Sequence, residues 1–272
     1  MEDKAKHDLM KTFLGGTVGV AAVLLIFLFV VYGRDTATIL EQLAHYTSQL
    51  LTGSIGYSAI TGGFLVNISI SILSMAIALA AGTIIGIGMI SQNTAIRWAA
   101  TAIMNVMRNS PWLVILYAML YLLPFQIHFM GGTYQFSPYL KAMVGLSLPV
   151  MANLAEVLRG SIEAIHMGQW ESARALGYKP LQVLRRVIIP QAIPRMIPNV
   201  MNLYAMLVIG SSLIVVTGTT DVLSVAKVIT ATQGEHLATA LYIYVLFMFF
   251  LYCFPIATLS RWYERKILET GQ

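Results

Sequence analysis

Residues 171–190, ESARALGYKPLQVLRRVIIP, form a long polar and basic segment between strongly apolar parts of the chain. The spacing within the segment is specific. Glu171-Ser172-Ala173 is followed after three residues by Gly177, and the segment ends with Ile189-Pro190. A connector of this kind between membrane helices usually contacts something outside the bilayer. We therefore expect a docking site in this segment.

The composition predicts an all-α polytopic membrane protein. Apolar residues make up 57% of the 272 residues and charged residues only 11%, whereas an ordinary soluble domain has about 25% charged residues. The apolar runs are continuous rather than alternating, which argues against a closed β-barrel. Because a spanning helix needs about 20 mostly apolar residues, we predict about six transmembrane helices. They lie at about 13–32, 60–90, 108–123, 139–155, 200–216 and 238–260.

Basic residues orient these predicted helices. If residues 171–190 are cytoplasmic and there are six spans, 14 of the 17 Lys and Arg residues lie on the cytoplasmic side, and only Arg34, Lys141 and Lys227 lie outside. Such an excess is typical of cytoplasmic loops, so both termini are predicted to be cytoplasmic. Anionic lipid at the inner leaflet accounts for the formal charge of +5, which therefore gives no support to a nucleic-acid partner.

The N-terminal part is predicted to be a retained helix followed by an amphipathic segment. Its apolar run is longer than the core of about 7 to 15 residues in a signal peptide, and the sequence YGRD at 32–35 is a poor cleavage site. Residues 36–51 then place five apolar or aromatic residues at helical spacing: Ile39, Leu40, Leu43, Tyr46 and Leu50. This pattern predicts either an amphipathic helix on the outer membrane face or a solvated linker helix.

The first half of the docking segment is predicted to be a short helix that ends at Gly177. Glu171 and Arg174 are three residues apart and can pair on one face of this helix. Another face carries Trp170, Ala173 and Leu176. Gly177 can adopt a left-handed conformation that ends the helix and turns the chain.

The second half is predicted to be an amphipathic helix that stops at Pro190, because proline lacks a helical donor and clashes with the preceding turn. Its apolar face would consist of Leu181, Leu184, Val187 and Ile188, opposite Arg185 and Arg186. The alternative is a pair of interfacial helices that only caps the bundle.

The spacing of the segment resembles the signature loop of the membrane subunits of bacterial ABC importers. In that loop a Glu-Ala-Ala triplet and a downstream Gly mark the part that docks on the ATPase subunit. Over about 60–266, the chain resembles the polar amino-acid importers, the histidine, glutamate, glutamine, arginine and opine group. The segments that carry this second resemblance are RNSPWLV at 108–114, AEVLRG at 155–160, GQWE at 168–171 and IPQA at 189–192.

The resemblance implies a type I ABC importer permease fold with a cytoplasmic coupling helix, in the bacterial inner membrane. Its partners would be two ATPase subunits, a second permease that is identical or homologous, a periplasmic solute-binding protein and membrane lipid. Contact with the ATPase would be made by Glu171, Ser172, Ala173, Arg174 and Gly177. The chain lacks a GxxxxGK[ST] phosphate loop, so ATP and Mg²⁺ would bind the ATPase and this chain would hold no cofactor.

On this basis the chain divides into three parts. Residues 1–59 form the N-terminal helix and amphipathic segment, 60–266 form the permease core with a coupling loop at about 160–198, and 267–272 form a tail. Gly82 and Gly86 in the core have the small-xxx-small spacing that permits close approach of two helices.

Polar residues within the predicted spans are candidates for the substrate path, because burying them in lipid is costly and they usually face a cavity or a neighbouring helix. These candidates are Asn67, Arg108, Asn153, Glu156, Ser211 and Ser212. The alternative for Glu156 is an ion pair with Arg159 or Arg108 near the cytoplasmic rim, and for Arg108 it is anchoring at the inner interface. Asn67 and Asn153 could instead bond between helices.

One departure from the family concerns the substrate site. The family usually has a Lys-Asp pair before a Ser/Thr-Ser-Leu sequence, whereas this chain has Ile209-Gly210 before Ser211-Ser212-Leu213. Two charges that could hold the carboxylate and amine of an amino acid are absent there. The resemblance implies ATP-driven import of a polar amino acid or a related zwitterion such as an opine, and which of these is carried is left open. The solute is expected to be held either in this subunit by Asn153, Glu156 and Ser211 or in the partner permease.

Other functional classes fit the sequence less well. A secondary transporter is expected to carry coupling carboxylates near the midplane and internal repeats, and only Glu156 approaches that description. A membrane enzyme would need a nucleophile with a base or a metal cluster, but there is no HExxH motif and the five His residues are scattered. We therefore predict no catalytic residues and no metal site. An ABC permease for another small solute is the main alternative.

Overall fold

The computed structural model of the chain describes residues 2–55, 60–129 and 132–270. Within them, five helical segments are long and apolar enough to cross a membrane, and shorter apolar helices accompany them. The five segments are Leu9–Thr52, Phe64–Met89, Pro138–Glu163, Pro180–Thr217 and Glu235–Ile267. The predicted all-α membrane fold is therefore confirmed.

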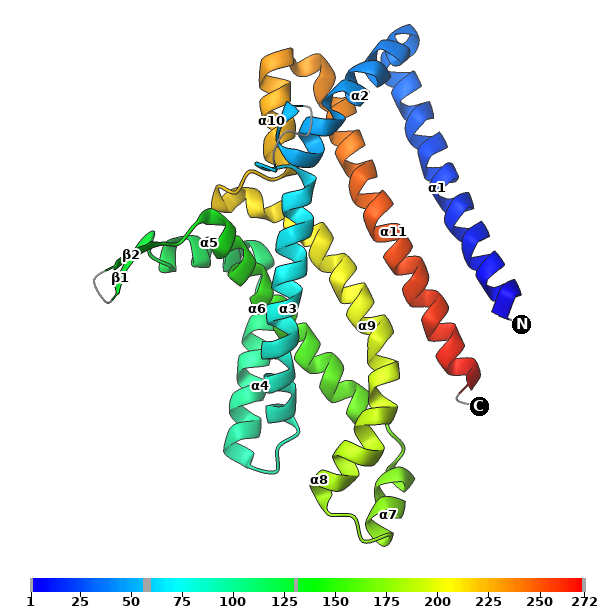
Figure 1. Cartoon of the computed structure of the whole chain (residues 1–272), viewed down its shortest axis with the longest axis vertical. Helices are drawn as coiled ribbons and strands as arrows, with labels where there is room; N and C mark the ends of the chain where they lie inside the picture. Colours follow the sequence, from blue (N-terminus) through cyan, green and yellow to red (C-terminus); the bar gives the residue numbers. More distant parts are fainter. Residues whose placement is uncertain (1, 56–59, 130–131, 271–272) are drawn as a thin grey trace.

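Helices account for nearly all of the described chain (Figure 1). The α-helices are α1 (Glu2–Tyr32), α2 (Thr36–Thr52), α3 (Phe64–Met89), α4 (Thr94–Arg108), α5 (Trp112–Leu122), α6 (Pro138–Glu163), α7 (Met167–Ala175), α8 (Pro180–Val183), α9 (Ile189–Gly210), α10 (Val222–Gln233) and α11 (Ala238–Thr270). A π-helical turn, η3 (Leu184–Ile188), joins α8 to α9, and a 3₁₀ segment, η4 (Ser211–Thr217), follows α9. Strands β1 (Gln126–Phe129) and β2 (Gly132–Gln135) pair as an antiparallel hairpin.

The prediction of a spanning helix at 108–123 is wrong. Helix α5 has only 11 residues, too few to cross a bilayer alone. The chain breaks before it because the side chains of Asn109 and Ser110 donate hydrogen bonds to the carbonyls of Asn105 and Val106, each at 2.7 Å. Pro111 then lies in an extended conformation and caps α5. Helix α4, which precedes the break, was not among the predicted spans.

Helices α3 and α6 form the centre of the core. They approach closely because Gly82 and Gly86 lack side chains: a Cβ atom on Gly82 would lie 2.6 Å from the carbonyl oxygen of Met151, and one on Gly86 would lie 2.6 Å from Leu158 Cδ2. The close packing predicted from the glycine spacing is thus confirmed. Residues buried around this contact include Ile70, Ala78, Leu116, Leu146, Val150, Leu154 and Leu207.

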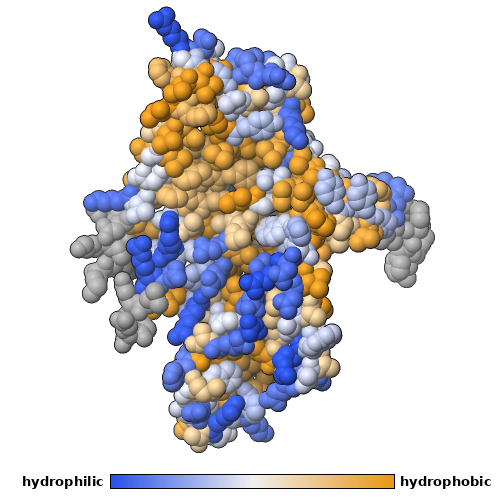
Figure 2. Space-filling model, turned by 180° about the vertical axis from the view of Figure 1, so that it is seen from behind, coloured by the Kyte–Doolittle hydropathy of each residue, from blue (hydrophilic) through white to orange (hydrophobic). Residues whose placement is uncertain are grey.

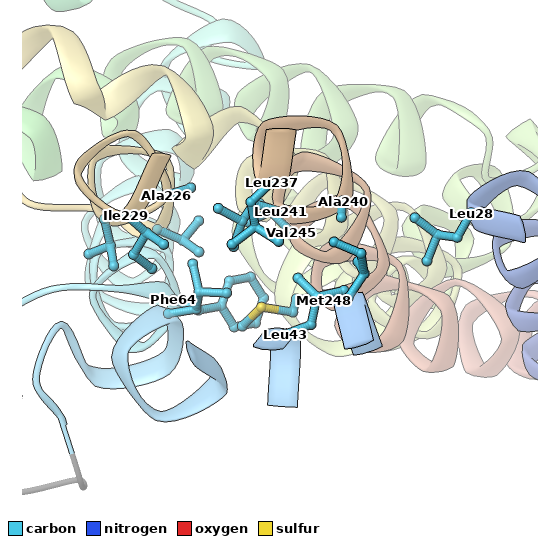
Figure 3. Packing of buried hydrophobic residues seen from close by; sticks show 14 residues of the cluster. Leu28, Leu43, Phe64, Ala226, Ile229, Leu237, Ala240, Leu241, Val245 and Met248 are labelled. Atoms are coloured by element: carbon cyan, nitrogen blue, oxygen red, sulfur yellow. The ribbon is translucent and has the colours of Figure 1, made fainter. Parts of the chain in front are cut away.

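A second apolar cluster joins α2, α10 and α11 beside the start of α3 (Figure 3). Of the five residues predicted for the apolar face of α2, Ile39, Leu43 and Leu50 are buried in it and Tyr46 packs against it, whereas Leu40 is exposed. The predicted helix is therefore confirmed, with a narrower apolar face. Helix α1 reaches this cluster through Leu28 and otherwise lies along α11, where Phe13 stacks on Phe254 with ring centroids 5.9 Å apart. Figure 1 shows α1 and α11 together at one side of the molecule.

Lys141 is buried and supports the short helix α5. Its Nζ atom donates hydrogen bonds to the carbonyls of Leu120 and Leu123, at 3.0 and 2.8 Å, and lies 3.8 Å from the centre of the Phe125 ring. A cation is favourable at a helix C-terminus and over an aromatic face. In the charge count Lys141 was only a residue outside the bilayer. In the structure it holds the C-terminal end of α5 and Phe125 against α6.

The surface divides into an apolar and a polar part. Figure 2 shows a broad hydrophobic surface over the upper half of the molecule and hydrophilic side chains gathered over the lower half. Helices α7 and α8 lie at the lower end in Figure 1, and the outer ends of α1 and α11 point in the same direction. The coupling loop and both ends of the described chain thus lie toward one side of the molecule.

Candidate functional site

The docking segment begins with α7, whose two ends are closed by local hydrogen bonds. At the N-terminus, the His166 side chain accepts a hydrogen bond from the Gly168 N–H at 3.1 Å. At the C-terminus, Gly177 has φ +82°, and its N–H donates to the Arg174 carbonyl at 2.9 Å. The Tyr178 N–H donates to the Ala173 carbonyl at 3.2 Å. The predicted left-handed turn at Gly177 is therefore confirmed.

One face of α7 is fastened to the ends of α6 and α9. Trp170 and Ala173 pack into a small apolar cluster between these helices. Polar contacts reinforce it, because Gln191 donates to Gln169 at 3.2 Å and Arg195 donates to the Ala164 carbonyl at 3.2 Å. The buried members of the cluster are Ile162, Ile165, Ala173, Val183, Ile188 and Ala192. Helix α7 thus shares one apolar cluster with the ends of α6 and α9.

The predicted stop of the second helix at Pro190 is wrong. Helix α8, the π-helical turn η3 and α9 follow one another without a break, and Pro190 occupies the first turn of α9. The wider π turn has i→i+5 hydrogen bonds, and a proline in a first helical turn removes a donor that has no regular partner. The apolar face is as predicted at Leu184, Val187 and Ile188, whereas Leu181 is exposed.

The other face of α7 and the turn after it are exposed. Met167 at the start of α7 is 66% exposed and Leu176 at its end is 76% exposed. Leu181 in the following helix α8 is 73% exposed. Leu176 therefore does not share the inner face with Trp170 and Ala173, as the spacing had predicted. Exposed apolar groups with charged neighbours are typical of a protein interface.

Of the five predicted coupling residues, four are accessible and one is not. Glu171, Ser172, Arg174 and Gly177 are exposed, whereas Ala173 is buried in the small apolar cluster with Ile162 and Ile188. Among the ion pairs of the described residues there is none between Glu171 and Arg174, so both charges point into solvent. Their side chains are thus accessible to a partner protein.

Glu156 is the centre of a row of charges on α4 and α6. Arg159 holds it with two hydrogen bonds, from Nε at 3.0 Å and from Nη2 at 2.7 Å, and also donates to Glu163 at 2.6 Å. Arg108 of α4 lies 3.6 Å from Glu156. All four side chains are partly exposed. Glu156 was predicted either to line the substrate path or to form an ion pair with Arg159 or Arg108. In the structure it contacts both arginines.

Asn67 and Ser211 are buried together between α3 and η4. The Asn67 amide donates to the carbonyl and the hydroxyl of Ser211, both at 3.1 Å, and its Oδ1 accepts from the Val222 N–H at 3.1 Å. The Ser211 hydroxyl donates to the Val208 carbonyl at 2.6 Å. Asn67 thus ties α3 to η4 and α10, and neither side chain is offered to an open path.

The other two predicted path residues are partly exposed. Asn153 donates to the Pro149 carbonyl one turn earlier in α6, at 2.8 Å, and Ser212 donates to the Ile209 carbonyl at 2.9 Å. Neither bond joins two helices. The alternative prediction that Asn153 bonds to a neighbouring helix is therefore wrong for the bond that it makes. Asn153 lies one turn before Glu156, on the same helix.

The position where the family usually has an Asp is closed by Trp112. A Cβ atom on Gly210 would lie 2.4 Å from Cζ3 of the Trp112 ring. Ile209, in place of the Lys, is 56% exposed. An acidic side chain at residue 210 would therefore require Trp112 to move. Sequence reasoning found the motif around Trp112 but had no signal for this contact, because the residues are almost 100 positions apart.

Comparisons with known proteins agree with this arrangement. The family model described as "Binding-protein-dependent transport system inner membrane component" matches residues 78–269. The chain is 30% identical to "Probable amino-acid ABC transporter permease protein YckA" of Bacillus subtilis (strain 168), over 72% of this chain and 84% of that protein. It is 27% identical to "L-cystine transport system permease protein TcyB" of the same organism, over 76% of this chain and 86% of TcyB.

Solved structures show the same fold. A crystal structure of an amino acid ABC transporter with histidines matches with a TM-score of 0.67 and 22% identity, over 85% of this chain and 97% of that chain. An inward-facing structure of the MetNI methionine ABC transporter matches with a TM-score of 0.56 and 18% identity, over 72% of this chain and 92% of that chain.

The family match covers most of the permease core, including the whole docking segment. Members of this family are the membrane components of their transport systems, so this chain is a permease and not itself the ATPase. The chain belongs to the inner membrane components of binding-protein-dependent transport systems and, among them, to the amino-acid ABC transporter permeases.

Proposed function

We propose that this permease works in a complex with two ATPase subunits, a second permease and a periplasmic solute-binding protein, and that the complex imports a polar amino acid. The observation that carries the proposal is the exposed apolar and charged face of α7 on a base fixed to α6 and α9. The relatives named for amino-acid and L-cystine transport support the class of solute.

In this proposal α7 transmits movement of the ATPase subunits to the membrane helices. Met167, Leu176 and Leu181 would enter a groove of the ATPase, with Glu171 and Arg174 at its rim. Because Trp170 and Ala173 pack against the ends of α6 and α9, closure of the ATPase pair would shift these two helices together. Helix α6 carries Glu156, so the movement would reach the row of charges.

The charge row could hold a zwitterionic solute within this subunit. Arg108 is the most loosely held cation of the row, since its 3.6 Å contact with Glu156 is longer than a good hydrogen bond. It could exchange this contact for the solute carboxylate, while Glu156 and Asn153 face the solute ammonium. Charge-assisted hydrogen bonds of this kind are short and strong.

A kinetic experiment tests this site. We expect Glu156→Gln to raise the KM for the imported amino acid about tenfold or more, since a hydrogen bond to a charged group contributes about 1.5 to 3 kcal/mol. Uptake is measured in proteoliposomes that contain the purified complex, after a thermal-shift screen of amino acids with the binding protein. Glu163→Gln is the matched control, because Glu163 lies at the far end of the row and is more exposed. Equal KM values for both variants would place the site elsewhere, without affecting the importer proposal.

The proposed orientation places both termini and α7 in the cytoplasm. It requires the short helices α4 and α5 together to return the chain across the membrane between α3 and α6. In a Cys253→Ala background, a cysteine at Thr38 in α2 should react with an impermeant thiol reagent applied to intact cells. A cysteine at Ser172 in α7 should react only after the membrane is opened. Both positions are exposed in the structure, so a difference in labelling reports the side of the membrane. Labelling of Ser172 in intact cells would reverse the orientation.

A further inference from the structure

An apolar cavity of about 180 Å³ lies between α1, α2 and α11. Its lining comes from all three helices: Ala21, Leu24, Leu25, Leu28, Leu40, Leu43, Ile243, Tyr244 and Phe247. In Figure 3, Leu28 stands on α1 at the edge of the apolar cluster, and Leu43 of α2 lies next to Met248 of α11. The cavity therefore lies between the C-terminal half of α1 and the helices α2 and α11.

The chemistry of the lining excludes a polar occupant. The only polar group among the lining side chains is the Tyr244 hydroxyl, and it is hydrogen-bonded to Thr47 Oγ1 at 2.9 Å. An ordered water molecule needs about two to four polar partners, and the lining offers none that is free, so water is held poorly in this cavity. Because the lining is apolar, the occupant that fits this cavity is a hydrocarbon group.

The position of the cavity favours a lipid chain. Leu28 precedes Tyr32, the last residue of α1, by about one helical turn, so the cavity lies inside the membrane near the corner between α1 and α2. The corner itself is closed, because Tyr32 donates a hydrogen bond to the His236 carbonyl at 2.8 Å. On the flank, Leu25 and Leu40 are exposed and leave a route from the surrounding bilayer.

The size of the cavity excludes a helix of another subunit. A helix with its side chains is about 10 to 12 Å wide, and a space of about 180 Å³ cannot receive one. We propose that one acyl chain of a phospholipid, from the leaflet on the α2 side, occupies this cavity and completes the packing of α1 on α11. The proposal is independent of the transported solute and of the coupling mechanism.

The first test fills the cavity. The full chain is extracted in a mild detergent and weighed by native mass spectrometry, which counts retained phospholipids. We expect Ala21→Phe to lower the fraction of chains that retain one phospholipid at least about fivefold. Val23→Phe is the matched control, because Val23 is on the same helix but outside the lining and largely exposed. Circular dichroism verifies that both variants are folded. Equal retention in both folded variants would overturn the proposal.

The second test uses the unchanged chain, so it does not depend on the folding of a variant. Membrane vesicles containing the chain are supplied with a phospholipid that carries a photoreactive group on its acyl chain, and labelled residues are mapped by mass spectrometry. Leu28 and Leu43 line the cavity and are each only 4% exposed, so a lipid that stays on the outer surface contacts them little, whereas an acyl chain in the cavity lies against both. Labelling of both supports the proposal, and labelling confined to outward residues such as Val23 and Val30 contradicts it.

Discussion

Replacing Gly177 by proline is expected to reduce ATP-driven uptake about 100-fold or more, while the chain still inserts into the membrane. Gly177 has φ +82°, and its N–H is bonded to the Arg174 carbonyl. Proline fixes φ near −65° and has no N–H, so it cannot form this turn, and an incompatible proline costs about 3 kcal/mol or more. A penalty of that size corresponds to a factor of about 100 in the population of the docking conformation. Uptake and ATP hydrolysis are measured in the same proteoliposomes.

Two glycine variants serve as controls for this result. Gly177→Ala keeps the N–H but places an L residue in the left-handed region, which costs about 1 to 2 kcal/mol, so uptake should fall only partly. Gly160→Ala should transport normally, because nothing lies within 4 Å of the added carbon and Gly160 is in a regular part of α6. Normal uptake by Gly177→Pro would show that the turn does not couple the ATPase to transport.

Replacing Gly82 by leucine is expected to lower the thermal unfolding midpoint of the solubilised chain by about 10 °C. A Cβ at this position would lie 2.6 Å from the Met151 carbonyl oxygen, so α3 and α6 would have to separate. Overpacking a core lowers the free energy of unfolding by about 1 to 3 kcal/mol. We expect the upper part of that range because the nearest atom belongs to the backbone of α6, which cannot change rotamer as a side chain can. In a chain of this size, each kcal/mol shifts the midpoint by about 2 to 4 °C.

Gly19→Leu is the control for the packing variant. Gly19 is in the middle of α1, and nothing lies within 4 Å of a carbon added there. Both variants add the same apolar side chain to a membrane helix, so they differ only in what that side chain meets. An unchanged midpoint for Gly82→Leu, measured by size-exclusion chromatography after heating, would contradict the close packing of α3 on α6.

The features that could be predicted from the sequence depend on local properties of the chain. Long apolar runs predicted α1, α3, α6, α9 and α11 because a bilayer requires continuous apolar helices whatever their neighbours are. The turn at Gly177 was predicted because glycine is the residue most often found in a left-handed helix end. Gly82 and Gly86 predicted a close approach, although the sequence did not identify α6 as the neighbouring helix.

The features that were missed depend on contacts between distant residues or on unusual backbone. The stacking of Trp112 on Gly210 joins α5 to the end of α9, and no periodicity reports such a pair. The continuation of the chain through Pro190 depends on a π turn, which propensity does not predict. Leu176 has the spacing of an inner residue, but it lies at the end of α7, where the turn carries it outward.

The central claim, that this permease serves import driven by ATP, is tested most directly by uptake in proteoliposomes. They contain the permease, its ATPase partner and a second permease where one copurifies, with the binding protein and labelled amino acid outside. The account predicts uptake that requires ATP inside and the binding protein outside, and that persists when ionophores collapse the proton and sodium gradients. Uptake driven by an ion gradient without ATP would contradict it.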